Sequence, residues 1–151
     1  MFRFRLIALN LLYFLNVLLI FLLLFEDKVQ LPLFLQVTGR MHPLVLHFPL
    51  VLLFVGIFLE LLITRKNFQH PAVLKITSYV FYFFAVSAAA TALFGFFLYK
   101  EGSYLGEEVM QHKWLGTVVS LLAVILVWLK ESPVVLVRYI TLGISTICLV
   151  L

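Results

Sequence analysis

Histidine is the side chain in this sequence with the widest chemical use, and there are four: His42, His47, His70 and His112. Neutral imidazoles are common ligands of haem iron and of other transition metals. The one cysteine, Cys148, excludes an internal disulfide and a multi-cysteine metal site, and no C-x-x-C-H motif is present for covalent haem attachment. The sequence also has no Gly-rich phosphate loop, no G-x-S-x-G and no H-E-x-x-H, so nothing indicates a kinase or a hydrolase.

The composition places these histidines in a membrane. Of the 151 residues, 64% are hydrophobic and only 12% are charged, and the mean hydropathy is +1.16. Soluble domains have about 45–50% apolar and about 25% charged residues, so this chain lacks the polar side chains for a water-exposed surface. The net charge of +4 comes from basic residues mostly at the ends of apolar runs. They are explained by membrane topology, and nucleic acid is not expected as a partner.

Five apolar runs are long enough to cross a bilayer, which takes about 20 residues. They cover about residues 6–25, 43–64, 74–99, 112–129 and 134–151. Helices are the open-chain structure that satisfies the backbone in lipid, and short connections make neighbouring helices antiparallel. We therefore predict an all-α integral membrane protein, with one domain folded as a five-helix transmembrane bundle.

Basic residues near the span ends predict the orientation. With the N-terminus in the cytoplasm, seven basic residues lie inside and four lie outside, which follows the positive-inside rule. The outer four are Lys28, Arg40, Lys100 and Lys113. This orientation puts the C-terminus outside and His70 in a cytoplasmic loop, where we expect a solvated side chain.

The other three histidines are expected together at the outer face. His42 precedes the second span, His47 lies about 7 Å deeper, and His112 opens the fourth span. A low-spin haem b needs two imidazoles that face each other from different helices at similar depth. We predict that His47 and His112 are this axial pair, because His47 lies within the apolar layer, and that His42 meets a propionate or a lipid headgroup.

Residues beside these histidines fit the same hypothesis. Gly116 lies one turn below His112, and Gly95 lies on the third span, so both leave room for a flat ring. Arg40 and Lys113 are at the level where haem propionates would emerge, and they would neutralise them.

Ordinary structural roles remain open for these residues. His42 can cap its helix and His112 can be an interfacial residue. The small residues between Ser87 and Ala92 are typical of close helix packing. Glu60 is expected to form an ion pair with Arg65 or Lys66 rather than a proton relay.

Two sequence blocks resemble a family of small bacterial membrane domains of unknown function that often precede c-type cytochrome domains. The first is G-R-M-H-P-L-V-L-H-F-P at residues 39–49, and the second is E-G-S-Y followed by H-K-W-L-G within residues 101–116. The resemblance implies a bacterial inner membrane, a respiratory neighbourhood, and functional roles for the three outer histidines. It also implies that the chain is the N-terminal part of a longer protein, since such domains commonly continue into a cytochrome c domain.

Three functions follow as hypotheses. The first is a membrane electron-transfer subunit that binds haem b and passes electrons between a quinol and a c-type cytochrome. The second is a non-catalytic anchor or assembly subunit of a redox complex, with structural histidines. The third is a small-solute or proton pathway, which ranks last because the cytoplasmic half of the spans offers only Glu60 and Thr77 as polar groups.

Overall fold

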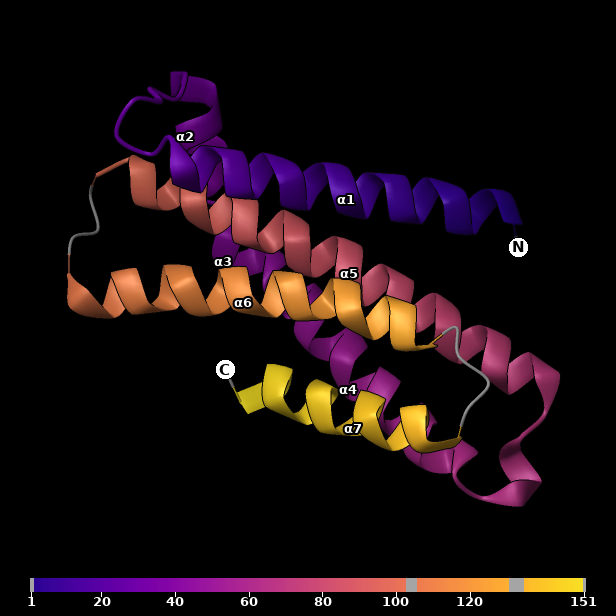
Figure 1. Cartoon of the computed structure of the whole chain (residues 1–151). Helices are drawn as coiled ribbons and strands as arrows, with labels where there is room; N and C mark the ends of the chain where they lie inside the picture. Colours follow the sequence, from indigo (N-terminus) through magenta and orange to yellow (C-terminus); the bar gives the residue numbers. More distant parts are fainter. Residues whose placement is uncertain (1, 103–105, 131–134, 151) are drawn as a thin grey trace.

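Every regular element in the described part of the chain is a helix (Figure 1). The computed structural model describes residues 2–102, 106–130 and 135–150. Its elements are α1 (Phe2–Leu24), α2 (Leu33–Gly39), α3 (His42–Val45), α4 (His47–Ile63), the 3-10 turn η1 (Lys66–Phe68), α5 (Pro71–Lys100), α6 (Glu107–Lys130) and α7 (Val135–Val150).

Four helical stretches are long and apolar enough to cross a membrane: Arg3–Leu24, His42–Ile63, Pro71–Lys100 and Glu107–Lys130. They correspond to the first four expected spans and confirm an all-helical architecture compatible with a multi-pass membrane protein. The fifth expected span, 134–151, matches α7, which is only 16 residues long within the described residues. Both ends of that expected span, residues 134 and 151, lie outside the described residues.

α1, α5 and α6 begin three to five residues earlier than the expected spans. α5 starts at Pro71 because His70 is its N-cap, with His70 Nδ1 accepting a hydrogen bond from the Ala72 N–H at 3.3 Å. α6 starts at Glu107, whose acidic first turn is stabilised by the helix dipole. His112 therefore lies inside α6, and the expectation that it opens this helix is wrong. The polar first turn of α6 does not register as part of a hydrophobic run.

The second span is interrupted near its start. Leu46 separates the short α3 from α4, and Pro49 has no N–H to donate to the carbonyl of Val45. Before this span, α2 forms a further short helix that hydropathy did not predict. The interruption matters because it sets the directions of the two histidines on either side of it.

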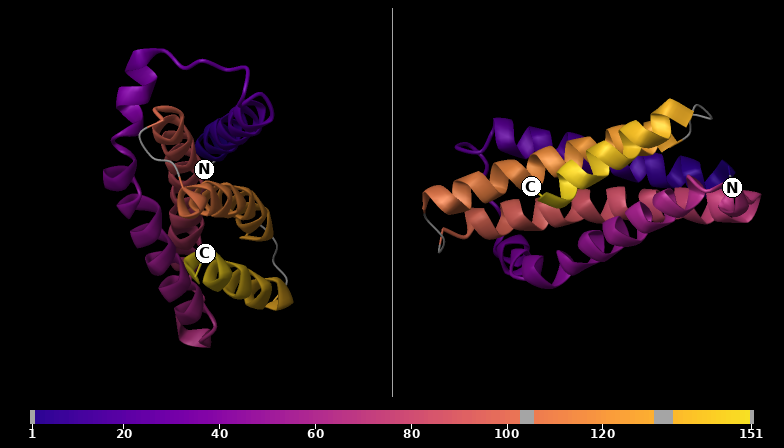
Figure 2. Two further views of the ribbon diagram at one scale, coloured as in Figure 1. Left: turned by 90° about the vertical axis from the view of Figure 1, so that its left-hand side faces the viewer. Right: turned by 90° about the horizontal axis from the view of Figure 1, so that it is seen from below.

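α5 is the central helix of the molecule. It packs against α1, α2, α3, α4 and α6, whereas α7 packs against α4 and α6. Figure 2, in its end-on view, shows α5 with α1 and α7 on opposite sides of it. Its buried face combines large aromatic and small residues: Phe81, Phe84, Ala85, Ala89 and Phe96.

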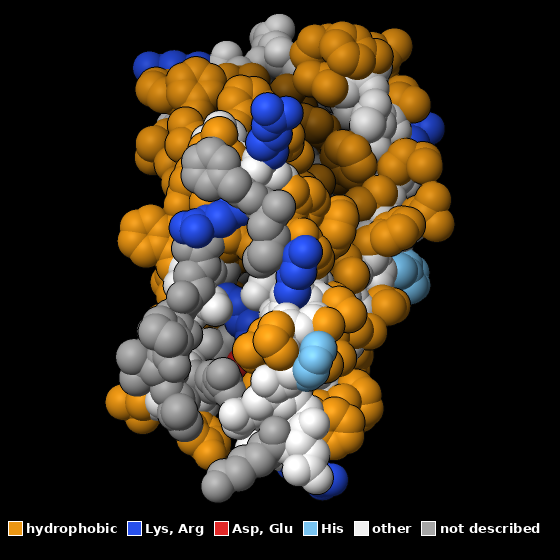
Figure 3. Space-filling model, turned by 90° about the vertical axis from the view of Figure 1, so that its right-hand side faces the viewer, with side chains coloured by type: hydrophobic (Ala, Val, Ile, Leu, Met, Phe, Trp, Pro, Cys, Tyr) orange, Lys and Arg blue, Asp and Glu red, His pale blue; other side chains and the backbone are white. Residues whose placement is uncertain are grey.

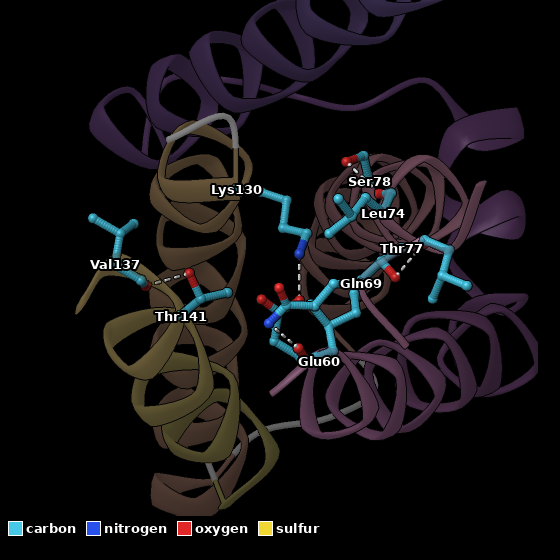
Figure 4. Close-up of polar contacts among 10 residues, drawn as sticks. Glu60, Gln69, Leu74, Thr77, Ser78, Lys130, Val137 and Thr141 are labelled. Atoms are coloured by element: carbon cyan, nitrogen blue, oxygen red, sulfur yellow. Dashed lines mark hydrogen bonds and ion pairs between the residues drawn. The ribbon is translucent and has the colours of Figure 1, made fainter. Parts of the chain in front are cut away.

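Glu60 on α4 forms a buried ion pair with Lys130 at the end of α6 (Figure 4). The expected partners, Arg65 and Lys66, were the neighbours in sequence, and the structure instead uses a residue from a helix that packs nearby. Figure 3 faces this end of the molecule, where Lys and Arg side chains stand over a mainly apolar surface. A polar pair is thus enclosed within an otherwise hydrophobic bundle.

Gly39 allows α2 to approach the backbone of α5. A Cβ at this position would lie 2.5 Å from the Leu98 nitrogen and 2.8 Å from the Phe97 carbonyl carbon. Backbone atoms cannot move aside as a flexible side chain can, so any other residue would push α2 away from α5.

We predict that Gly39→Ala destabilises the protein by about 1–3 kcal/mol, the usual cost of overpacking. Thermal unfolding in detergent measures the effect. Gly143→Ala on α7 is the control, because a Cβ there meets no atom within 4 Å. Equal melting temperatures for the two variants would contradict the close approach of α2 and α5.

The topology yields a second prediction. With the N-terminus in the cytoplasm and α7 as a fifth span, a reporter fused after Leu151 lies outside the cytoplasm. Paired fusions to reporters that function only outside or only inside the cytoplasm measure this placement. Activity of the cytoplasmic reporter would show either that α7 does not cross or that the orientation is reversed.

Candidate functional site

The start of α3 and the second turn of α6 bring two imidazoles together. The ring centroids of His42 and His112 are 5.7 Å apart, and the ring planes are nearly perpendicular at 80°. The two residues come from separate helices and lie 70 positions apart in sequence. This is the convergence of two imidazoles that the sequence predicted, but with His42 in the place expected for His47.

His42 is held by α5. Its Nδ1 lies 3.0 Å from the carbonyl oxygen of Thr91. Because a carbonyl oxygen only accepts, Nδ1 carries the proton and donates, and Nε2 is left with a lone pair. A hydrogen-bonded second nitrogen of this kind orients metal-binding histidines in proteins.

Gly95 makes room for the His42 ring, one turn beyond Thr91 on α5. A Cβ at Gly95 would lie 3.0 Å from His42 Cε1. Gly95 therefore accommodates the His42 imidazole directly, and its expected role beside a flat cofactor ring stays a prediction. Gly116 differs from it, because a Cβ there meets no atom within 4 Å and the space beside it is open.

Two cavities adjoin the histidine pair, and both are lined by His42, Ala92, His112 and Gly116. One has a volume of about 280 Å³ and is also lined by Gly95, Tyr99 and Lys113. The other has a volume of about 220 Å³ and mostly apolar walls, which include Leu53, Phe84 and Cys148. Ligand pockets in proteins typically measure roughly 300–1,000 Å³, so the two cavities together offer a space of that order.

Charged side chains surround the outer end of the site in pairs. Lys113 Nζ lies 2.8 Å from a carboxylate oxygen of Glu26 and 4.0 Å from the centre of the Tyr99 ring. Arg40 donates hydrogen bonds to Glu101, with its Nε 3.0 Å from Oε1. Lys113 lines the larger cavity and Arg40 does not. Both of the cations expected to meet propionates are therefore already paired with carboxylates.

His47 lies away from this site. Its side chain is exposed, its Nδ1 is 2.9 Å from the carbonyl oxygen of Pro43, and it lines neither of the two cavities. Five residues on a helix correspond to a rotation of about 140°, so His42 and His47 face different directions. His47 and His112 therefore do not form the facing pair that the sequence predicted. Metal binding by any of the histidines stays a prediction. His70 is exposed, as expected, and caps α5.

The donor set at this site is small. Within residues 2–102, 106–130 and 135–150, no group of three or more His, Cys, Asp or Glu side chains could hold a metal ion. Two imidazoles alone do not complete the tetrahedral coordination of a structural zinc ion. They do suit a cofactor that supplies the remaining ligands itself, as a porphyrin does.

Sequence reasoning missed three residues of the site. Thr91 acts through its backbone carbonyl, which carries no signal in the side-chain pattern. Glu26 is the carboxylate partner of Lys113, and Cys148 lines the inner cavity from α7. The small-residue run at residues 87–92 was the available signal for Thr91, since it marks where another element can approach α5 closely.

Arg40 and Glu101 make the outer end sensitive to acid. The hydrogen bonds from Arg40 lower the pKa of the Glu101 carboxyl from its ordinary value of 4.5; burial opposes this lowering, and the positive charge of Arg40 adds to it. A lowered pKa means that the pair stabilises the fold above pH 4.5 and that this contribution is lost as the pH falls through the lowered value.

We therefore predict that part of the acid-induced loss of stability disappears in Glu101→Gln. Melting temperatures measured between neutral pH and about pH 3 would show a shallower decline for this variant than for the unmodified chain. Glu107→Gln is the control, because Glu107 is exposed and no salt bridge is found for its side chain within the described residues. A decline as steep in Glu101→Gln as in the unmodified chain would contradict the prediction.

Comparison with known proteins adds no assignment. The chain matches no protein-family model, no curated protein and no solved structure. The resemblance of residues 39–49 and 101–116 to small bacterial membrane domains stays an expectation, and residues 103–105 of the second block lie outside the described residues. The function must be inferred from the geometry of this chain.

Proposed function

We propose that this protein is a membrane electron-transfer subunit that binds haem b between His42 and His112, near the outer face. The observation that carries the proposal is the pair of imidazoles from separate helices, with ring centroids 5.7 Å apart. In this proposal His42 takes the axial role that the sequence predicted for His47. His112 keeps the role predicted for it.

The separation of the rings supports a single metal ion between them. Bonds from imidazole nitrogen to a metal are about 2.0–2.1 Å long, so two of them span about 4 Å, and the two rings would move slightly apart from their present separation to hold one ion. The cavities beside the pair and the open space at Gly116 offer room for a flat macrocycle.

The residues of the chain have distinct roles in this proposal. The Thr91 carbonyl fixes the orientation of the His42 ring and increases its basicity. The apolar walls formed by Leu53 and Phe84 exclude water, and they tune the reduction potential through the local dielectric. Lys113 and Arg40, which now pair with Glu26 and Glu101, would be the cations available to hold the propionates. Bound haem supplies a one-electron carrier.

The proposed electron partners are a quinol in the lipid and a c-type cytochrome or another respiratory subunit at the outer face. The proposed location is the bacterial inner membrane, with the N-terminus in the cytoplasm. The lipid partner is supported by the apolar surface of the four long helices, on which large side chains such as Phe14, Phe54 and Phe58 are exposed.

A second candidate function is a non-catalytic anchor within a redox complex. The ion pairs favour it, since Arg40 and Lys113 have carboxylate partners and tie the ends of the helices together. In that case His42 and His112 stabilise the contact between α3 and α6, and the purified protein has no colour.

We predict that the purified full chain shows the pyridine haemochrome spectrum of haem b. His42→Ala and His112→Ala should each lower the haem content at least about tenfold, because one axial ligand is lost in each. His47→Ala is the matched control and should keep full haem content, since His47 is exposed and bonded within its own helix turn.

Each alternative gives a different result in the same experiment. Loss of haem in His47→Ala with retention in His42→Ala would restore the axial pair predicted from sequence. A colourless protein whose three variants are as stable as the unmodified chain would overturn haem binding and favour the anchor.

A further inference from the structure

The beginnings of α1 and α5 meet at the end of the bundle opposite the start of α6 (Figure 1). The ring centroid of Phe4 on α1 is 4.9 Å from that of Tyr79 and 5.5 Å from that of Phe83, both on α5. This contact also brings together two cations. Arg3 precedes Phe4 in α1, and the ammonium group of Lys75, one turn before Tyr79, is 5.9 Å from the centre of the Tyr79 ring.

The charges of the protein are separated between its two ends. Most carboxylates of the described residues lie in or beside the connections at the other end: Glu26, Asp27, Glu101, Glu107 and Glu108. The remaining described carboxylate, Glu60, is buried and paired with Lys130. Arg3 and Lys75 are exposed, and no salt bridge is found for either of them within the described residues. The face shown in Figure 3 accordingly has blue side chains spread over it and very little red.

The length of α5 sets the depth of Lys75 in a bilayer. The 30 residues of this helix correspond to about 45 Å, which matches a hydrocarbon core of about 30 Å together with its two headgroup layers. Lys75 is the fifth residue of α5, so it lies about 6 Å from the helix start. Each headgroup layer is about 5–7 Å thick, so Lys75 is at the depth of the phospholipid phosphates.

The face of α5 below Lys75 changes character in the order that a phospholipid does. Lys75, Tyr79 and Phe83 are spaced four residues apart, so they lie on one side of the helix. They cover about 12 Å from the end of the bundle towards its middle. Along this line an ammonium group is followed by a phenol hydroxyl and then by the Phe83 ring, which is 54% exposed. A phospholipid presents its phosphate, its glycerol oxygens and its acyl chains in the same sequence.

We propose that Arg3, Lys75 and Tyr79 bind the headgroup of an anionic phospholipid and that one of its acyl chains lies over Phe83. The two cations bind the phosphate oxygens, and the Tyr79 hydroxyl donates a hydrogen bond to the phosphodiester or to a glycerol oxygen. The proposal depends neither on haem nor on which side of the membrane this end faces.

The net charge of the site selects among phospholipids. Two cations without a neighbouring carboxylate fit a headgroup with a net negative charge, as in phosphatidylglycerol. Phosphatidylcholine has the same phosphodiester but adds a quaternary ammonium group, which the guanidinium of Arg3 and the ammonium of Lys75 would repel. The difference between these two lipids therefore measures the charge complementarity of the site.

A general attraction between cations and the membrane surface makes a different prediction. Basic residues at the ends of spans are common and need no particular lipid, whereas basic pockets between helices hold individual headgroups. Arg3 and Lys75 belong to separate helices that the Phe4 ring joins. Arg65 is an exposed cation in the connection from α4 to α5, and no ring contact links it to this cluster among the described residues. The proposal thus assigns different effects to Arg65 and Lys75.

The test is a lipid titration of the purified full chain in detergent, followed by native mass spectrometry, which measures the fraction of protein with one bound lipid. We expect phosphatidylglycerol to bind at least about tenfold more tightly than phosphatidylcholine of the same chain length, because each cation contributes about fivefold. Binding should weaken as the salt concentration rises. Glycerol 3-phosphate, which has the phosphate without acyl chains, should not displace the lipid when it is added in excess.

Variants locate the site. Arg3→Gln and Lys75→Gln should each weaken phosphatidylglycerol binding about fivefold, and Tyr79→Phe, which loses one hydrogen bond, should weaken it by a similar factor. Arg65→Gln is the matched control and should change the affinity less than about twofold. Lys75→Arg keeps the charge and should restore binding, which separates a lost charge from a lost fold.

The outcomes decide between a site and its alternatives. Equal affinities for the two lipids overturn the proposal, and so does a loss in Arg65→Gln as large as that in Lys75→Gln, which would indicate attraction to the whole basic end. Displacement by glycerol 3-phosphate overturns the lipid as the ligand, because the acyl chains would then contribute nothing. The haemochrome spectrum tests the proposed function separately, since none of these measurements requires haem.

Discussion

Polar groups inside an apolar bundle must find their hydrogen-bond partners within the protein, and this constraint organises the whole molecule. The backbone meets it by forming helices over most of the described residues. Most buried hydroxyls meet it locally, since Thr77, Thr91, Thr117 and Thr141 each donate to the carbonyl four residues earlier. Against this background, the polar groups that reach across to another helix, or have no partner, mark the positions where function is to be sought.

Three of the groups that depart from the local pattern lie in the interior of the bundle. The Thr91 carbonyl bonds to His42 from a different helix, Asn16 on α1 accepts a hydrogen bond from Ser120 on α6, and Glu60 pairs with Lys130 but keeps one oxygen free. The Asn16–Ser120 bond is buried, and it joins two helices. It is an ordinary polar contact between membrane helices. The other two lie at opposite ends of the bundle, and the contact between Thr91 and His42 is part of the site on which the proposed function rests.

α5 connects these two ends. Its small residues let neighbouring elements approach closely, and Gly95 accommodates the His42 ring directly. Its aromatic residues fill the space between helices, and Phe81 packs near Lys130 while Phe84 lines the inner cavity. A single rigid element therefore positions the histidine site and contributes to the surroundings of the buried ion pair. The two sites have different exposure, since the histidines adjoin open cavities and Glu60 is enclosed.

The sequence by itself determined the class of protein, the approximate positions of four apolar helices, and the pairing of histidines from two separate helices. These features follow from composition and from run length, which are sums over many residues and tolerate local error. It also identified Gly95 and Gly116 as positions with room beside a histidine. It could not choose between His42 and His47, because that choice depends on the interruption at Leu46 and on the rotational phase of the helix that follows.

The tertiary structure alone decided the partners. His42 faces His112 because α3 packs against α5, where Thr91 and Gly95 receive the imidazole. Glu60 pairs with Lys130 rather than with Arg65, because the end of α6 lies beside α4 while Arg65 points into the surroundings of the bundle. The ion pairs that Glu26 and Glu101 form with Lys113 and Arg40 likewise could not be predicted from the sequence pattern. Contacts between residues 60–90 positions apart depend on how helices pack, and side-chain spacing within one helix carries no information about them.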